Sequence, residues 1–155
     1  MVRNIGLAAM AAIAILIADM ASAIAATLVA RVDVSTQTMT VSQHGRVIHR
    51  WPVSTARRGF ITPRGSWKPK RLHRMWHSRK YDMSPMPYSV FYHRGYAIHG
   101  TNQVRSLGRP ASHGCVRLRT TNAKRFYDLV RRHGIGNTRV VVVNARSAAI
   151  LSTVS

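Results

Sequence analysis

The sequence contains one cysteine, no glutamate and only four aspartates. A single cysteine cannot form an intramolecular disulfide, so Cys115 is either an inert buried thiol or a reactive one. Without glutamate, the chain has no glutamate pair for glycoside hydrolysis. His73 and His77 in "HRMWH" also lack the glutamate that zinc proteases place between two such histidines. Because eight histidines without a cysteine cluster or a carboxylate set make a weak metal site, we expect no metal.

Acidic residues are scarce, whereas lysine and arginine together number 24, which gives the chain a formal charge of +20. A surface of this kind attracts anionic polymers. We expect anionic cell-wall polymers as partners through the basic surface, although a solvated basic surface without a partner explains the composition equally well. The sequence contains no nucleic-acid-binding motif, so we expect no specific nucleic acid.

An apolar run lies near the N-terminus, from Ile5 to Ala18, after a basic start. Its 14 residues fall short of the roughly 20 that span a bilayer, and Asp19 ends it. Small residues follow, as at a signal-peptide cleavage site. We therefore expect residues 1–25 to be a signal peptide cleaved near Ala23–Ala26, or a retained signal anchor. Export to the periplasm or cell wall of a bacterium follows from either.

The rest of the chain predicts one mostly β domain over residues 28–145, followed by a frayed tail over 146–155. Alternating or continuous apolar patterns predict strands in "TLVARVDV", "QTMTVSQ", "RVIHRWPVS", "YSVFYHRGYAIHG" and "TRVVVVN". Turns are expected at His44-Gly45 and near His93–Gly95. The stretch 55–87, rich in glycine, proline and basic residues, predicts a long loop.

One clear α-helix is predicted at about 120–133, in "TTNAKRFYDLVRRHG". Its apolar side chains recur with helical spacing, at Ala123, Phe126, Tyr127 and Val130. We expect Thr120 or Thr121 to cap its start and Gly134 to end it.

The motif "GRPASHGCVRL" surrounds Cys115 with polar residues, which argues against an inert apolar thiol. A nucleophilic thiol needs a base, and His99 at the end of the strand "YAIHG" is the first candidate. His113 is the second candidate. The amides of Gly114 and Cys115 can face one substrate oxygen as an oxyanion hole, because glycine permits a sharp turn.

Three further groups complete the expected site. A histidine base needs a partner that orients its ring, and the Gly100 carbonyl is the first choice, with Asn102 as the alternative. Arg117 can stabilise a thiolate or bind a substrate carboxylate. Ser112 can form a hydrogen bond within the cysteine loop.

The spacing "AIHGT…SHGCVRL" resembles the active-site signature of the YkuD-type L,D-transpeptidase catalytic domain. Upstream, "VDVSTQTMTVSQHGRVIHRWPVSTA", "TPRGSW" and "MPYSVFY" resemble other segments of this family, and the likeness runs from about Ala30 to Asn144. The resemblance implies a β-sandwich or barrel with the helix packed beside it. It also implies no cofactor, and we expect a monomer.

The resemblance implies that Cys115 is the nucleophile, His99 the base and Gly100 the orienting residue. Ser112, His113 and Gly114 would form the oxyanion and active-site loop. Arg117, Asn102 and Tyr88 would bind substrate or stabilise the thiolate.

The substrate implied by the resemblance is a peptidoglycan stem tetrapeptide. Its terminal D-alanine leaves as a Cys thioester forms, and an amine then forms a crosslink. Two alternatives stay open: an L,D-carboxypeptidase or endopeptidase with water as acceptor, and a non-catalytic basic protein that binds wall polymer.

Overall fold

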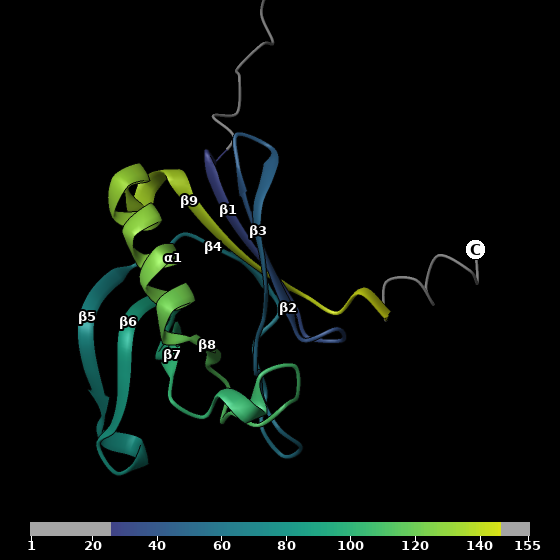
Figure 1. The fold of residues 1–155 in the computed structure, drawn as a ribbon, viewed down its shortest axis with the longest axis vertical. Helices are drawn as coiled ribbons and strands as arrows, with labels where there is room; N and C mark the ends of the chain where they lie inside the picture. The colour runs from purple at the N-terminus through teal and green to yellow at the C-terminus, as the bar shows by residue number, and fades with distance from the viewer. Residues whose placement is uncertain (1–25, 147–155) are drawn as a thin grey trace, which may run out of the picture.

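The computed structural model describes residues 26–146, which form two β-sheets with one α-helix packed beside them (Figure 1). The predicted leader, and the predicted tail apart from Arg146, lie outside these residues. The elements in chain order are β1 Leu28–Asp33, β2 Thr38–Gln43, β3 Arg46–Pro52, β4 Gly65–Trp67, β5 Arg71–Ser78, η1 Arg79–Tyr81, β6 Ser84–His93, β7 Tyr96–Thr101, η2 Val104–Ser106, β8 Val116–Arg119, α1 Thr120–His133, η3 Ile135–Asn137 and β9 Thr138–Val143.

The first sheet has the strand order β3-β2-β1-β9-β4. Leu28, Ala30 and Val32 alternate along β1 and are fully buried, as the sequence pattern predicts. The predicted turn between β2 and β3 is confirmed, because both His44 and Gly45 adopt positive φ angles (48° and 77°), which suits a tight hairpin. The last strand, β9, runs parallel to β1 and lies between it and β4.

The second sheet has the order β5-β6-β7-β8. The predicted hairpin between β6 and β7 is confirmed, with Arg94 in its turn. The long loop expected over residues 55–87 is wrong, because β4, β5 and the start of β6 lie within it. β5 is an edge strand rich in exposed basic residues, so it lacks the apolar alternation by which a strand is recognised.

Helix α1 packs against β6, β7 and β8 of the second sheet. Its buried residues include Ala123, Phe126 and Val130, and Gly134 ends it as predicted. The expected threonine cap is wrong: Arg119 occupies the N-cap position, and Thr120 Oγ1 instead donates to the Thr101 carbonyl (3.4 Å). No helix within residues 26–146 is long and apolar enough to cross a membrane.

The main hydrophobic core brings together residues of both sheets and of the helix. It includes Leu28, Val32, Met39, Val53, Val90, Tyr92, Ile98, Val116, Leu118, Phe126, Val130 and Val140. The predicted mostly β, sandwich-like fold with one helix is thus confirmed.

Candidate active site

The predicted nucleophile and base come from neighbouring strands of the second sheet. β7 and β8 are parallel, with Ile98 opposite Val116 and His99 opposite Arg117. Ile98 and Val116 belong to the main core, so the alternation of side chains places His99, Arg117 and the preceding Cys115 on the opposite face. All three of these residues line one cavity on that face.

His99 is oriented by the backbone of its neighbour, as the sequence analysis expects. Its Nδ1 lies 2.7 Å from the Gly100 carbonyl oxygen. Because a carbonyl only accepts, Nδ1 carries the proton and Nε2 is left as the basic nitrogen. Burial is the main cause that lowers the pKa of His99 to about 4, with Arg117 acting in the same direction and the Gly100 carbonyl opposing it. The ring is therefore neutral near pH 7.

Gly100 is also required by packing. A Cβ at this position would lie 2.9 Å from both Cα and Oγ1 of Thr120, the first residue of α1. A side chain here would push β7 away from the helix and displace the carbonyl that holds His99.

Cys115 is half-buried and packs against a small apolar cluster of Met86, Phe91 and Ala97. Burial raises the pKa of the Cys115 thiol, whereas a hydrogen bond from the Ala97 backbone and the charge of Arg117 act against the increase. The resting site therefore pairs a neutral thiol with a neutral imidazole, and the proton has to move when a substrate arrives.

The loop before Cys115 is built on Ser112, which is fully buried. Ser112 Oγ donates to the Cys115 carbonyl (2.6 Å) and accepts from the Gly114 amide (3.0 Å). The expectation that the Gly114 amide faces a substrate oxygen is therefore wrong for this arrangement. The amide of Cys115 is the remaining donor of the expected pair.

Gly114 could not be another residue without rearrangement. Its φ angle is +132°, and a Cβ would lie 2.5 Å from Tyr96 Cε1 and 2.8 Å from the Ile61 carbonyl oxygen. Thr62 Oγ1 donates to the Gly114 carbonyl (2.8 Å) and accepts from the Ala56 amide (3.0 Å). No signal in the sequence predicts this role of Thr62, although the segment "TPRGSW" that resembles the family begins at this residue.

The cavity around Cys115 has a volume of about 1180 Å³. Its lining includes Gly59, Phe60, Ile61, Arg71, Trp76, Arg79, Lys80, Tyr81, Met86, Phe91, Tyr96, His99, Asn102, Gln103, Ser112, His113, Cys115 and Arg117. These side chains include four lysine or arginine cations and no carboxylate, so the cavity carries a positive charge.

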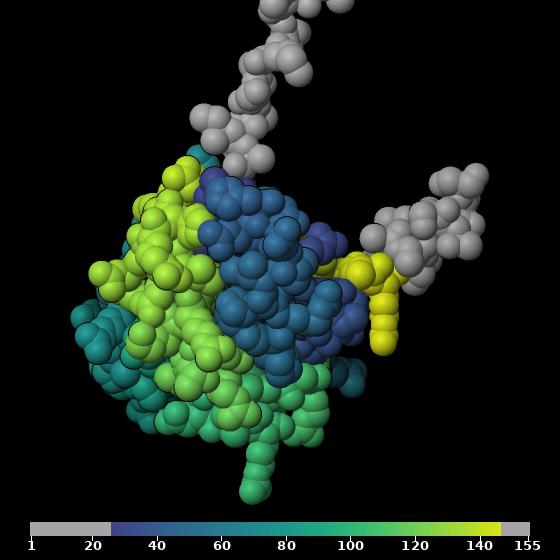
Figure 2. All heavy atoms as spheres, turned by 45° about the horizontal axis from the view of Figure 1, so that its top comes forward, coloured from purple at the N-terminus to yellow at the C-terminus, as the bar shows by residue number. Residues whose placement is uncertain are grey.

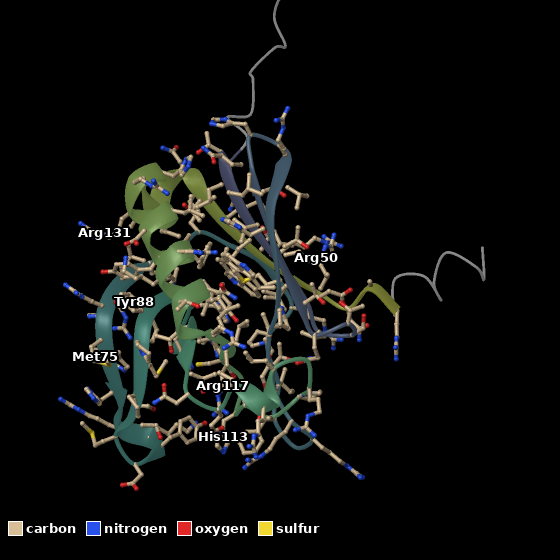
Figure 3. All side chains as sticks on the ribbon, in the orientation of Figure 1. Arg50, Met75, Tyr88, His113, Arg117 and Arg131 are labelled. Atoms are coloured by element: carbon tan, nitrogen blue, oxygen red, sulfur yellow. The ribbon has the colours of Figure 1, made fainter. Side chains whose placement is uncertain are left out.

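His113 joins three segments at the rim of this cavity. Its ring stacks on Tyr81 (4.4 Å between centroids) and meets Phe60 edge-on (4.6 Å). Its Nε2 accepts a hydrogen bond from Arg57 Nη2 (2.9 Å). Burial and then Arg57 lower the pKa of His113, which favours the neutral ring that this contact needs. His113, labelled in Figure 3, thus lies at the rim. His99, in contrast, is buried.

The guanidinium groups of Arg117 and Arg71 are each held by contacts with neighbouring side chains of the cavity. Arg117 Nη1 donates to Gln103 Oε1 (3.0 Å), a partner that the sequence analysis did not name. The guanidinium of Arg71 lies over the ring of Phe91 (4.2 Å) and near that of Trp76 (5.1 Å). Asn102 lines the cavity, and His99 is oriented by the Gly100 carbonyl rather than by this residue.

Tyr88 does not line the cavity, and its expected role in substrate binding or thiolate stabilisation stays a prediction. Its ring packs on Tyr127 of the helix (5.7 Å), away from Arg117 and His113 (Figure 3). Tyr88 has a φ of 54°, which interrupts the regular alternation of β6. For this reason Met86 and Phe91, five residues apart, pack in one cluster, whereas Tyr88 packs against the main core.

Within residues 26–146, no three histidine, cysteine, aspartate or glutamate side chains lie close enough together to hold a metal ion. The site therefore consists of a thiol, a neutral imidazole, backbone donors and arginines.

Known proteins with similar sequences are L,D-transpeptidases. The probable L,D-transpeptidase ErfK/SrfK of Escherichia coli K12 is 32% identical over 101 residues, which cover 58% of this chain and 32% of that protein. The probable L,D-transpeptidase YbiS of the same strain is 46% identical over 43 residues, 28% of this chain and 14% of that protein. The chain thus matches about a third or less of the length of these curated relatives.

Solved structures agree with the sequence comparisons. An L,D-transpeptidase from Mycobacterium tuberculosis H37Rv has a TM-score of 0.68 and 26% identity, over 76% of this chain and 58% of that one. An L,D-transpeptidase from Mycobacterium smegmatis has a TM-score of 0.67 and 25% identity, over 76% and 58%. The profile of the YkuD family, described as the L,D-transpeptidase catalytic domain, matches residues 28–142. The chain therefore belongs to the L,D-transpeptidase catalytic domain family.

Proposed function

We propose that this protein is a cysteine-dependent L,D-transpeptidase that acts on peptidoglycan stem tetrapeptides. The observation that carries the proposal is the pairing of Cys115 with His99 in one cavity, with the ring of His99 held by the Gly100 carbonyl. Such a substrate lies outside the cytoplasm, and the leader expected over residues 1–25 would provide the export that it requires.

The first step forms an acyl-enzyme. His99 Nε2 accepts the thiol proton as Cys115 Sγ attacks the carbonyl of the third stem residue, a diamino acid. The S–C bond forms, and a tetrahedral intermediate places a negative charge on the former carbonyl oxygen. The Cys115 amide is the donor that this loop offers to that oxygen. Collapse of the intermediate breaks the C–N bond, and His99 returns the proton to the amine of the departing D-alanine.

The second step transfers the acyl group to an acceptor. A neutral amine attacks the thioester carbonyl and gives a proton to His99. The C–S bond then breaks as the new amide forms, and His99 passes the proton to the departing Cys115 thiolate. The His99 ring is unprotonated near pH 7, so its Nε2 is free to accept a proton in both steps.

The charge of the cavity supports an acidic substrate. Stem peptides carry carboxylates, and Arg71, Arg79, Lys80 and Arg117 line the cavity without an acidic neighbour in its lining. Arginine binds carboxylates through paired hydrogen bonds. The rings of Phe91 and Trp76 hold the Arg71 guanidinium in place, which lowers the cost of ordering it on a substrate.

The proposal can be tested with purified disaccharide-tetrapeptide and reduced protein, with products followed by mass spectrometry. The expected result is loss of D-alanine, a crosslinked dimer, and a trapped adduct on Cys115 with the mass of the disaccharide-tripeptide acyl group. Cys115→Ala should abolish all three.

Other outcomes separate the alternatives. If D-alanine is lost and tripeptide is the only other product, the thioester forms but water, rather than an amine, is the acceptor. Equal product formation by Cys115→Ala would refute the nucleophile. Sacculus binding without turnover, unchanged in Cys115→Ala, would instead support the non-catalytic binding protein.

A further inference from the structure

A second cavity lies between the edge strand β3 and helix α1. Its volume is about 630 Å³, and it shares no lining residue with the cavity around Cys115. Figure 2 shows the helix, in yellow-green, beside the β2–β3 hairpin, in blue. The residues that line this cavity are His49, Arg125, Asp128, Leu129, Arg131 and Arg132.

Helical spacing places cations on both sides of an apolar floor. Arg125, Leu129 and Arg132 follow one another at i, i+4 and i+7 and therefore lie on one face of α1. Leu129 is buried, whereas the two arginines are exposed. Opposite them, the His49 ring stacks on Trp51 with centroids 4.6 Å apart and an interplanar angle of 17°. Trp51 is itself buried, so His49 stacks on a ring that belongs to the core.

The positive charge of this cavity is not neutralised within the described chain. Asp128 is its one acid, and the Asp128 carboxylate pairs with Lys124 Nζ (2.7 Å), the only salt bridge among residues 26–146. The hydrogen bond from Lys124 is also the main cause that lowers the pKa of Asp128. Arg131 and Arg132 lie close enough to lower it further, but none of the three arginines of this cavity forms a salt bridge with the Asp128 carboxylate. Burial and then the charge of Arg125 lower the pKa of His49, which means that the neutral ring faces a positive field.

We propose that this cavity is an anion-binding site that takes the phosphate group of a polymer, with Arg125 and Arg132 as its main ligands. A phosphate that links two units of a polymer carries one negative charge on two non-bridging oxygens, and these charges repeat along the chain. Arginine guanidinium groups bind such oxygens through paired hydrogen bonds. A neutral His49 can donate one further hydrogen bond. The site is separate from Cys115, so it holds the domain on an anionic polymer while the catalytic cavity stays free.

The test uses the full chain and three probes: polyphosphate, polyglutamate and phosphatidylglycerol vesicles. Binding is measured by calorimetry at fixed ionic strength, with the His49 ring resonances followed by NMR. Arg125→Gln combined with Arg132→Gln should weaken polyphosphate binding by about tenfold or more, because charge-assisted hydrogen bonds are lost. Arg31→Gln combined with Arg139→Gln is the matched control. Both of its arginines lie on the first sheet outside this cavity, and the control should change affinity by less than the cavity variant does.

Several results would overturn the proposal. Equal losses in the two double variants would mean that net charge alone binds the polymer. Polyglutamate bound as tightly as polyphosphate would refute phosphate as the ligand, and cavity-dependent binding to vesicles but not to polyphosphate would refute a polymer source. His49 resonances that stay fixed on saturation with polyphosphate would place the ligand elsewhere. Thermal unfolding of each variant checks that the fold is retained, and activity on soluble tetrapeptide should stay unchanged.

Discussion

The Nδ1 atom of His99 and the carbonyl oxygen of Gly100 lie 2.7 Å apart, although the two residues are neighbours in sequence. The contact fixes the tautomer of the base without a carboxylate, in a chain whose only acids are four aspartates. A side chain that orients a histidine base can be removed by substitution, whereas the backbone carbonyl of Gly100 cannot. The protonation of His99 itself has to be measured.

We expect the acid limb of kcat/KM to have its midpoint near pH 4, because burial lowers the pKa of His99 to about 4 from its ordinary 6.5. Activity on a soluble tetrapeptide should therefore change little from pH 7 to pH 5.5. The measurement is a pH–rate profile together with the His99 ring resonances by NMR. A midpoint near 6.5 in both would contradict the assignment.

The same shift makes stability depend on pH. An unfolded His99 takes up a proton as the pH falls below 6.5, whereas the folded one does so only near 4. The free energy of unfolding is therefore highest above pH 6.5 and falls between 6.5 and 4. Urea unfolding at several pH values should show this slope, and His99→Gln should reduce it. An unchanged slope in the variant would assign it to other groups.

Gly114→Ala should lower the free energy of unfolding by about 1–3 kcal/mol, because alanine is strained at a φ of +132° and its Cβ meets Tyr96 and Ile61. The substitution should also lower kcat/KM at temperatures where the protein stays folded, since the loop that carries Cys115 has to move. Gly136→Ala is the control: no atom lies within 4 Å of its Cβ position. Equal effects of the two substitutions on thermal unfolding would refute the argument.

Thr62→Val should also loosen the cysteine loop. It leaves the Gly114 carbonyl and the Ala56 amide without their hydrogen-bond partner, at a cost of about 1–3 kcal/mol. Chemical denaturation measures the loss. Thr38→Val, which removes one longer bond to the Thr36 carbonyl (3.2 Å), should cost less. A Thr62 variant as stable as the Thr38 variant would show that the loop does not depend on this hydroxyl.

Arg71→Met should raise the KM for tetrapeptide by about tenfold with kcat nearly unchanged, because a charge-assisted contact to a carboxylate is lost. Arg74→Met removes the same charge from β5, but Arg74 does not line the cavity. Steady-state kinetics of both variants separate a local contact from net charge. Equal increases in KM would favour net charge.

The helix and the two hairpins could be predicted because their signals are local. Phe126 and Val130 repeat with helical spacing, and His44-Gly45 occupies a turn that suits it. β5 could not be predicted in this way, because an exposed basic edge strand owes its conformation to its pairing with β6. Nothing local in "RLHRMWHS" distinguishes it from a loop.

The reacting groups of the site could be predicted from the sequence. The residues that hold those groups in place were harder to predict. Cys115, His99 and Gly100 were named from a short motif, and the cavity brings them together. Tyr88 does not line the cavity, because it alternates with Val90 and Tyr92 along β6 and packs with them against the main core. The Gly114 amide was misassigned because Ser112 Oγ occupies it, a contact that depends on backbone angles rather than on spacing.

The parallel pairing of β1 with β9 has a consequence for how the chain folds. The first and last strands of the described domain are neighbours in one sheet, with Leu28 opposite Thr138 and Asp33 opposite Val143 (Figure 1). Contacts between residues so distant in sequence form late and slow the folding of small domains. A chain emerging from a ribosome or a translocation channel therefore cannot complete its first sheet until its final strand has been released. Truncation before Thr138 would leave β1 and β4 without their shared partner.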